Sequence, residues 1–140
     1  MGCSGVPKTC EPLWTTSLPL TDIELTVSGN RVYASGDGGS AALDQNGVVI
    51  WTSGVCGAGG WPAAVADGIL YGVTVGNGVF LCAMDALSGA WLWQGKVYSG
   101  PTVSGAPSVV GDSVYIGGGS NLYAFSSGNG SGCPGTTLPR

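Results

Sequence analysis

The chain has 140 residues, only four of them Lys or Arg and eight Asp or Glu, and its formal net charge is −4 without any histidine. A nucleic-acid partner needs clustered cations, whereas Lys8, Arg31, Lys96 and Arg140 are scattered, so we predict no nucleic-acid binding. The absence of histidine also removes the commonest general base and the commonest metal ligand.

The N-terminal stretch reads GCSGVPKTCEPLW and holds two of the five cysteines. It lacks the apolar core of a signal peptide, and no apolar stretch of the chain reaches the length of a transmembrane helix, so we predict no membrane span. Cys3 and Cys10 bracket a loop with Gly and Pro that suits a chain reversal. The two strands joined by this loop can hold their cysteines within bridging distance, and we predict a disulfide between them.

A motif then recurs along the chain in units of roughly forty residues. Each unit has a Trp after an apolar residue, a turn signal before an apolar-Tyr strand, and a closing turn glycine. The three sets are Trp14, Trp51 and Trp93; Tyr33, Tyr71 and Tyr115; and Gly47, Gly89 and Gly130. We place the repeats at approximately residues 11–47, 48–89 and 90–130, and we interpret residues 131–140 as the start of a truncated fourth repeat.

Within a unit, short runs of Val, Ile, Leu, Tyr and Trp are separated by Gly-Asn, Asp-Gly or Gly-Asp, which favour tight hairpin turns. In the second unit we predict strands near residues 62–66, 69–75, 79–85 and 91–97. No segment of helical length has a 3.6-residue period. The sequence therefore predicts an all-β protein of about three four-stranded antiparallel blades, the building units of a β-propeller.

The segments APSVVGDSVYIGGGSNLYAF and CAMDALSGAWLW resemble the tryptophan-docking blade of the PQQ-like (quinoprotein-type) β-propellers. The resemblance covers nearly the whole chain and implies propeller blades that form an incomplete ring on their own. CSGVPKTCEPLW is similar to a blade connection of secreted bacterial propellers in this group, in which a hairpin loop carries a Cys-x6-Cys pair just before the Trp strand.

Enzymes of this family use a complete ring of blades around a quinone cofactor, with calcium or a similar ion, a catalytic Asp and often two adjacent cysteines. Here no two cysteines are adjacent, no cluster of Asp, Glu and Asn is apparent, and three blades enclose no funnel. We therefore predict a protein that is not an enzyme, with no catalytic residue, cofactor or metal ligand. Asp44 and Asp85 each begin a turn that ends in glycine, and we expect them to cap backbone N–H groups there.

The remaining aromatic residues suggest two roles. Trp14, Trp51 and Trp93 recur once per blade, and we expect them to fill the space between adjacent sheets. Trp61 falls outside this register, beside a proline. Together with Tyr98 it is our candidate for a surface on which a ligand stacks, and packing at a blade edge is the competing interpretation.

Five cysteines in a chain of low charge, without zinc-like spacing, indicate an oxidising compartment. We predict a second bridge between Cys56, which follows one Trp strand, and Cys82 in the next blade, although sequence alone leaves the connectivity open. Cys133 is then unpaired or linked to another molecule. We therefore expect a secreted, cell-surface or periplasmic protein.

Our preferred interpretation is a non-catalytic extracellular scaffold or protein-interaction module that assembles through its open blade ends. Its partners would be other copies of itself, further blades of a longer parent, or an extracellular protein or glycan. In a self-assembly, the strand at residues 13–16 would join the strand at residues 121–125 of another copy, closing a six-bladed ring or extending a filament. The alternatives are a carbohydrate- or small-ligand-binding propeller domain and a fragment of a quinoprotein oxidoreductase.

Overall fold

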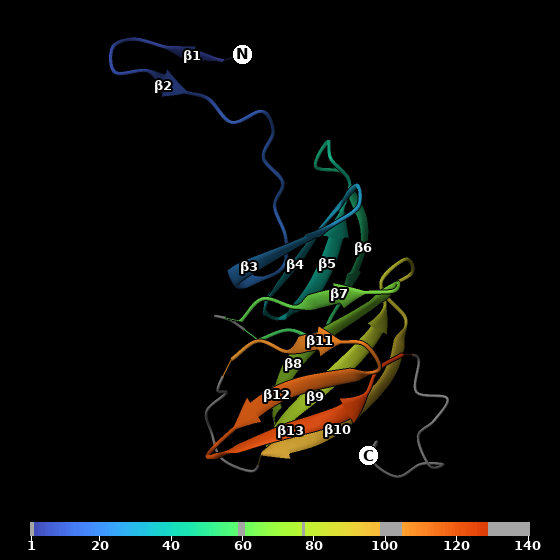
Figure 1. Cartoon of the computed structure of the whole chain (residues 1–140). Helices are drawn as coiled ribbons and strands as arrows, with labels where there is room; N and C mark the ends of the chain where they lie inside the picture. Colours follow the sequence, from blue (N-terminus) through green and yellow to red (C-terminus); the bar gives the residue numbers. More distant parts are fainter. Residues whose placement is uncertain (1, 59–60, 77, 99–104, 129–140) are drawn as a thin grey trace.

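The computed structural model describes residues 2–58, 61–76, 78–98 and 105–128. Within these ranges the chain forms β-strands and no helix (Figure 1). Accordingly, none of the described segments is a helix long and apolar enough to cross a membrane. The predicted all-β class is confirmed.

The strands form three successive sheets, which we call blades one, two and three, and a small N-terminal hairpin. Blade one contains β3 (Thr21–Ser28), β4 (Arg31–Asp37), β5 (Gly39–Leu43) and β6 (Val49–Ser53). Blade two contains β7 (Ala64–Ala66), β8 (Ile69–Gly76), β9 (Gly78–Asp85) and β10 (Trp91–Tyr98). Blade three contains β11 (Ser108–Val110), β12 (Ser113–Gly118) and β13 (Asn121–Ser126). Neighbouring strands are antiparallel and follow chain order, and the described part of blade three has three strands where the other blades have four.

Turn chemistry explains why the strands lie close to their predicted positions. Between β7 and β8, Asp67 and Gly68 have φ angles of 51° and 77°. A two-residue hairpin turn with positive φ at both positions matches the right-handed twist of its flanking strands, and Asp-Gly is among its preferred sequences. The flanking residues Ala66 and Ile69 pair directly, as such a turn requires.

The strand register shows that the blades are equivalent. The tyrosine on the second strand of each blade faces an alanine on the third strand, and the pairs are Tyr33–Ala42, Tyr71–Ala83 and Tyr115–Ala124. This common register lets residues of one blade be compared with those of the next. The predicted repeat boundaries remain a prediction; under them, β6 and β10 belong to the repeat that follows the rest of their blade.

The core lies between the blades rather than within a closed barrel. Alternate residues of β9 point to opposite faces of its sheet, so that Cys82 and Met84 face blade one while Leu81 and Ala83 face blade three. All four side chains are fully buried, which accounts for the unbroken apolar run in this central strand. A leucine buried in this way contributes about 2 kcal/mol through removal of its surface from water.

The N-terminal hairpin joins β1 (Cys3–Ser4) to β2 (Thr9–Cys10) and projects away from the blades (Figure 1). It is followed by an extended segment, residues 11–20, that runs to blade one. Leu18 and Leu20 of this segment pack with buried residues on the face of blade one that points away from blade two. Residues 13–16, which we expected to form a strand, belong to no sheet in the described structure. No described strand lies alongside them to complete a ladder.

Candidate interaction site

Each tryptophan of the repeat contacts the segment that follows the third strand of a blade. The indole Nε1 donates a hydrogen bond to a turn carbonyl in three equivalent pairs, each at 2.9 Å: Trp14 to Gln45, Trp51 to Ala86, and Trp93 to Gly128. Trp51 links blade one to blade two, and Trp93 links blade two to blade three. Their side chains are 9% and 7% exposed, whereas Trp14 is 41% exposed.

The turns that receive the tryptophans are built by an aspartate and a glycine. The Asp85 carboxylate accepts hydrogen bonds from two N–H groups of its own turn, at 2.8 and 3.1 Å, and Asp44 does the same at 2.8 and 3.0 Å. Both aspartates therefore have the predicted capping role. Gly89 closes the turn with φ +78°, and a Cβ atom there would lie 2.7 Å from the Trp51 ring. The glycine thus leaves room for the indole.

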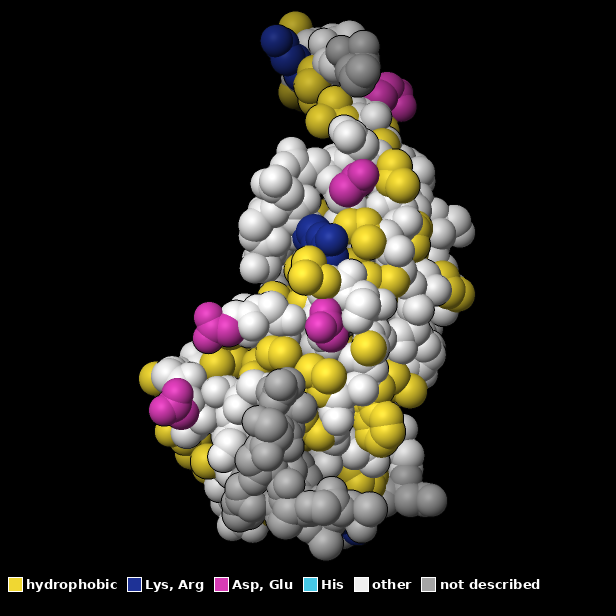
Figure 2. All heavy atoms as spheres, turned by 90° about the vertical axis from the view of Figure 1, so that its right-hand side faces the viewer, with side chains coloured by type: hydrophobic (Ala, Val, Ile, Leu, Met, Phe, Trp, Pro, Cys, Tyr) yellow, Lys and Arg dark blue, Asp and Glu magenta, His cyan; other side chains and the backbone are white. Residues whose placement is uncertain are grey.

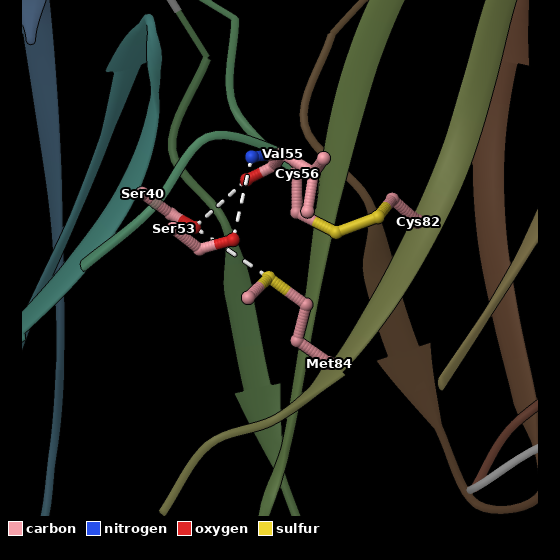
Figure 3. The surroundings of a disulfide bond; sticks show 6 residues. All are labelled: Ser40, Ser53, Val55, Cys56, Cys82 and Met84. Carbon is pink, nitrogen blue, oxygen red and sulfur yellow. Dashed lines mark hydrogen bonds between the residues drawn. A yellow bond between two sulfur atoms is a disulfide. The ribbon is translucent and has the colours of Figure 1, made fainter. Parts of the chain in front are cut away.

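A cysteine pair reinforces the junction between blades one and two (Figure 3). Cys56, in the connection after β6, and Cys82 of β9 form a disulfide with a Cα–Cα distance of 5.4 Å, and neither is exposed. Beside it, the buried Ser40 hydroxyl lies 3.0 Å from the carbonyl oxygen of Val55 and 3.5 Å from the Met84 sulfur. The connection is therefore held both to blade one and to blade two.

The other cysteine pair lies in the projecting hairpin. Cys3 and Cys10 are directly paired across β1 and β2 and form a disulfide with a Cα–Cα distance of 3.9 Å. All described residues of this hairpin are exposed, and Val6 at its tip is 100% exposed. The bridge therefore closes a local loop without joining blades. Cys133, our candidate for an unpaired or intermolecular cysteine, lies outside the described residues.

The proposed ligand-stacking pair is divided between the two edges of blade two. Trp61 is half-buried just before β7, and its backbone carbonyl accepts a hydrogen bond from Ser35 at 3.2 Å. Tyr98 ends β10, where its backbone pairs with Val79, and its side chain lies outside the described part of the structure. Because β8 and β9 lie between β7 and β10, the two residues lie at opposite edges of the sheet.

One end of the stack presents an apolar strand that sequence reasoning did not single out. On β3, Ile23, Leu25 and Val27 are 40%, 60% and 69% exposed. Thr26 between them donates to the carbonyl of Ala63 in the second blade's entry segment, so the three apolar residues face away from blade two. Their alternation in TDIELTVS identifies an apolar face of the strand, although a face covered by another blade would show the same pattern.

The opposite end of the stack is also uncovered. Tyr115 of β12 is 36% exposed and Leu122 of β13 is 73% exposed. Their equivalents in blade two, Tyr71 and Leu81, are 1% and 0% exposed because blade three covers them. The face of blade three therefore has the residue pattern of a blade interface without a neighbouring blade in the described structure.

A quinone cofactor with a metal ion does not fit the described residues. They contain no group of three or more His, Cys, Asp or Glu side chains that could hold a metal ion. A cavity of about 320 Å³ lies between blades two and three, and Asp67 is the charged residue in its lining beside Tyr71, Val109 and Ser127. No Lys or Arg lines this cavity to bind an anionic cofactor.

The charged side chains are dispersed. Figure 2 shows one face of the molecule, on which Lys, Arg, Asp and Glu stand singly among apolar and neutral side chains. A phosphate backbone is bound by grouped cations, and this face offers none. The apolar strands at the two ends of the stack are therefore the most distinctive surfaces for recognition.

Comparisons with known proteins agree with this architecture. A family model for PQQ repeats, described as outer membrane protein assembly factor BamB, matches residues 6–137. A comparison with curated protein sequences finds no match.

The solved structures that resemble the chain include two bacterial proteins. BamB from Moraxella catarrhalis is 21% identical with a TM-score of 0.62, and the match covers 84% of this chain and 34% of that one. A quinohemoprotein alcohol dehydrogenase from Pseudomonas putida HK5 is 24% identical with a TM-score of 0.58, and the match covers 73% of this chain and 18% of that one. The chain thus spans about a third or less of these proteins, and the likeness establishes the fold.

Proposed function

The chain belongs to the PQQ-like β-propeller repeat family, and on that premise we propose that it is a non-catalytic scaffold for protein interaction. The observation that carries the proposal is the pair of uncovered apolar ends, represented by Leu25 on β3 and Leu122 on β13, which are 60% and 73% exposed. Exposed, contiguous apolar surface next to an unpaired strand edge is typical of sites where proteins bind one another. The description of the matching family as an assembly factor supports the same role.

The proposed location is outside the cytoplasm, in the periplasm or beyond the cell surface. Two cysteine pairs lie at disulfide distance, and such bridges persist mainly in oxidising compartments. The location is tested on the protein as isolated from its host, which is unfolded in denaturant without reductant and treated with a reagent that alkylates free thiols. Cys56 and Cys82 should remain unmodified, and their alkylation would contradict the proposal.

The absence of catalysis is tested with the intact chain, a quinone cofactor, calcium and a panel of alcohols and sugars. We expect no turnover above a heat-inactivated control, since the described residues fit neither the cofactor nor the metal ion. Turnover that depends on the cofactor would overturn the non-catalytic role and favour the oxidoreductase alternative.

The interaction role is tested by cross-linking the protein in the envelope of its native host. Leu25→Lys places a charge on the open face of β3, whereas Leu87→Lys does so on an equally accessible turn, where Leu87 is 67% exposed. We expect the first variant alone to lose its cross-linked protein partners. Equal cross-linking of both variants would contradict a role for this face.

The alternative role in glycan binding makes a different prediction. A glycan array should then give binding that is lost in Trp61→Ala and kept in the matched exposed variant Trp91→Ala. Trp91 is 57% exposed in the same blade. We expect no such selective loss, because Trp61 and Tyr98 occupy opposite edges of blade two.

A further inference from the structure

A contact between tyrosine and tryptophan attaches the fourth strand in blades one and two. The ring centroids of Tyr33 and Trp51 are 6.4 Å apart, and those of Tyr71 and Trp93 are 6.2 Å apart. In both blades the tryptophan also pairs with the alanine that faces the tyrosine across the sheet. The same three residue types on adjacent strands thus make the same contact twice.

Blade three contains two members of this trio. Tyr115 faces Ala124, as the register of the other blades requires, but no described tryptophan contacts Tyr115. The 36% exposure of Tyr115 contrasts with 5% and 1% for the equivalent tyrosines. Residues 127–140, which follow β13, contain no tryptophan.

Trp14 is the missing member at the other end of the molecule. It makes the same indole-to-turn hydrogen bond as the other two tryptophans, but among the described residues it has no tyrosine ring beside it. Residues 13–16 lie in no sheet, and Trp14 stays 41% exposed. Trp14 and Tyr115 are therefore the tryptophan and the tyrosine of the repeated ring contact, each exposed and without its partner ring among the described residues.

Trp14 and Tyr115 lie at opposite ends of the stack of blades. The three blades stack in chain order, so that Trp14 and Thr16 bond to the turn between β5 and β6 of blade one at one end, and β12 and β13 of blade three lie at the other (Figure 1). Blade two fills the space between them through its two buried interfaces. A second copy is the partner whose surface already has the required residues in the required register.

We propose that residues 13–16 of one copy form the fourth strand of blade three in a second copy. By the register of blades one and two, Trp14 would lie opposite Ala124 and pack on Tyr115, and Thr15 would lie opposite Tyr123. Trp14 would keep its hydrogen bond to Gln45 of its own copy. Trp51 likewise pairs with Ala42 in blade one while its indole donates to Ala86 in blade two. The joint continues the interface that already holds the blades together inside the chain.

The same joint covers both apolar ends. Blade one of the first copy would bring Leu25 and Val27 against the face of blade three that carries Leu122, in the way that blade three covers Leu81 of blade two. Because this contact uses different surfaces on the two copies, it closes a ring if the rotation permits and otherwise extends into a filament. The inference rests on the proposed scaffold role and identifies its partner as a second copy.

The first experiment measures the mass of the intact chain by sedimentation equilibrium at micromolar concentration. We expect a species of at least twice the 13.9 kDa of one chain. Leu122→Lys should raise the dissociation constant by about tenfold or more, because assembly would bury an unpaired charge. The matched exposed variant Leu87→Lys should assemble as the wild type does. A wild-type monomer, or equal assembly of both variants, would overturn the proposal.

The second experiment tests the register by trapping the joint in a Cys133→Ser background. One preparation carries Thr15→Cys, and the other carries Tyr123→Cys. Directly opposed positions on paired strands lie within disulfide range, so mixing the two should give a covalent dimer on a non-reducing gel. Ala124→Cys is the control, because a shift by one residue turns the side chain to the other face. Equal trapping with Ala124→Cys would refute the register.

The two proposals fail in different ways. A monomer with no trapped dimer would remove the self-assembly, while partner cross-links that depend on Leu25 would leave the scaffold role intact. Cofactor-dependent turnover would remove the non-catalytic role and would have no bearing on the trapped dimer.

Discussion

Replacing Gly89 by alanine tests whether tryptophan docking holds blades one and two together. Gly89 and Gly68 have nearly the same φ, +78° and +77°, so alanine meets a similar backbone strain of about 1–2 kcal/mol at each. A Cβ atom at Gly68 would have no neighbour within 4 Å, whereas at Gly89 it would lie 2.7 Å from the Trp51 ring. Only Gly89→Ala therefore has to displace the indole of Trp51.

The size of the difference follows from what Trp51 loses. Its side chain is 9% exposed and donates to the carbonyl of Ala86 at 2.9 Å. Complete removal of such a tryptophan costs about 3–5 kcal/mol, and partial displacement forfeits part of that sum. We expect Gly89→Ala to lower the free energy of unfolding by about 2 kcal/mol more than Gly68→Ala does.

The assay is urea denaturation followed by far-ultraviolet circular dichroism, which reports the sheets rather than any one tryptophan. Both variants should retain the wild-type m-value, so that their midpoints compare stability directly. Losses that agree within about 0.5 kcal/mol would refute the reasoning, since they would show that the turn tolerates a methyl group against Trp51.

Three further outcomes are expected. Trp51→Ala should cost about 3–5 kcal/mol in urea denaturation and Trp91→Ala about 1 kcal/mol or less, because the two side chains are 9% and 57% exposed; equal costs would mean that Trp51 is not a packing residue. Replacing Cys56 and Cys82 together by alanine should cost about 3–4 kcal/mol for a bridge across 26 residues, and an unchanged melting temperature would contradict this. Asp85→Ala should cost about 1–2 kcal/mol through loss of two turn hydrogen bonds, and amide exchange in that turn should quicken; unchanged exchange would argue against the cap.

The positions of the strands were predictable because their causes are local. Alternating apolar residues define a strand and its buried faces, and Asp-Gly defines the turn at Asp67 and Gly68 through the φ angles that it permits. The capping by Asp44 and Asp85 was predictable for the same reason, since a short carboxylate reaches N–H groups of its own turn. The family resemblance added the assembly of the strands into blades.

The candidate surfaces were less accessible to sequence reasoning. Trp61 and Tyr98 lie at the two edges of one sheet, and only the strand order places β8 and β9 between them. The apolar face of β3 has an ordinary alternating pattern, TDIELTVS, that a strand buried between two blades would also have. Whether such a face is covered depends on a neighbour that the local sequence does not encode.

Trp14 and Trp51 illustrate the division most directly. Each follows an apolar residue in the same repeated motif, and each donates its indole N–H to a turn carbonyl at 2.9 Å, so the motif by itself determines how a tryptophan docks. Their exposures are nevertheless 41% and 9%. Trp51 lies in β6 and is paired with β5, whereas Trp14 enters the stack with no described strand beside it. Hydrogen bonding within a turn is a short-range interaction, but burial depends on the sheet packed against the side chain, and that was decided by the tertiary structure alone.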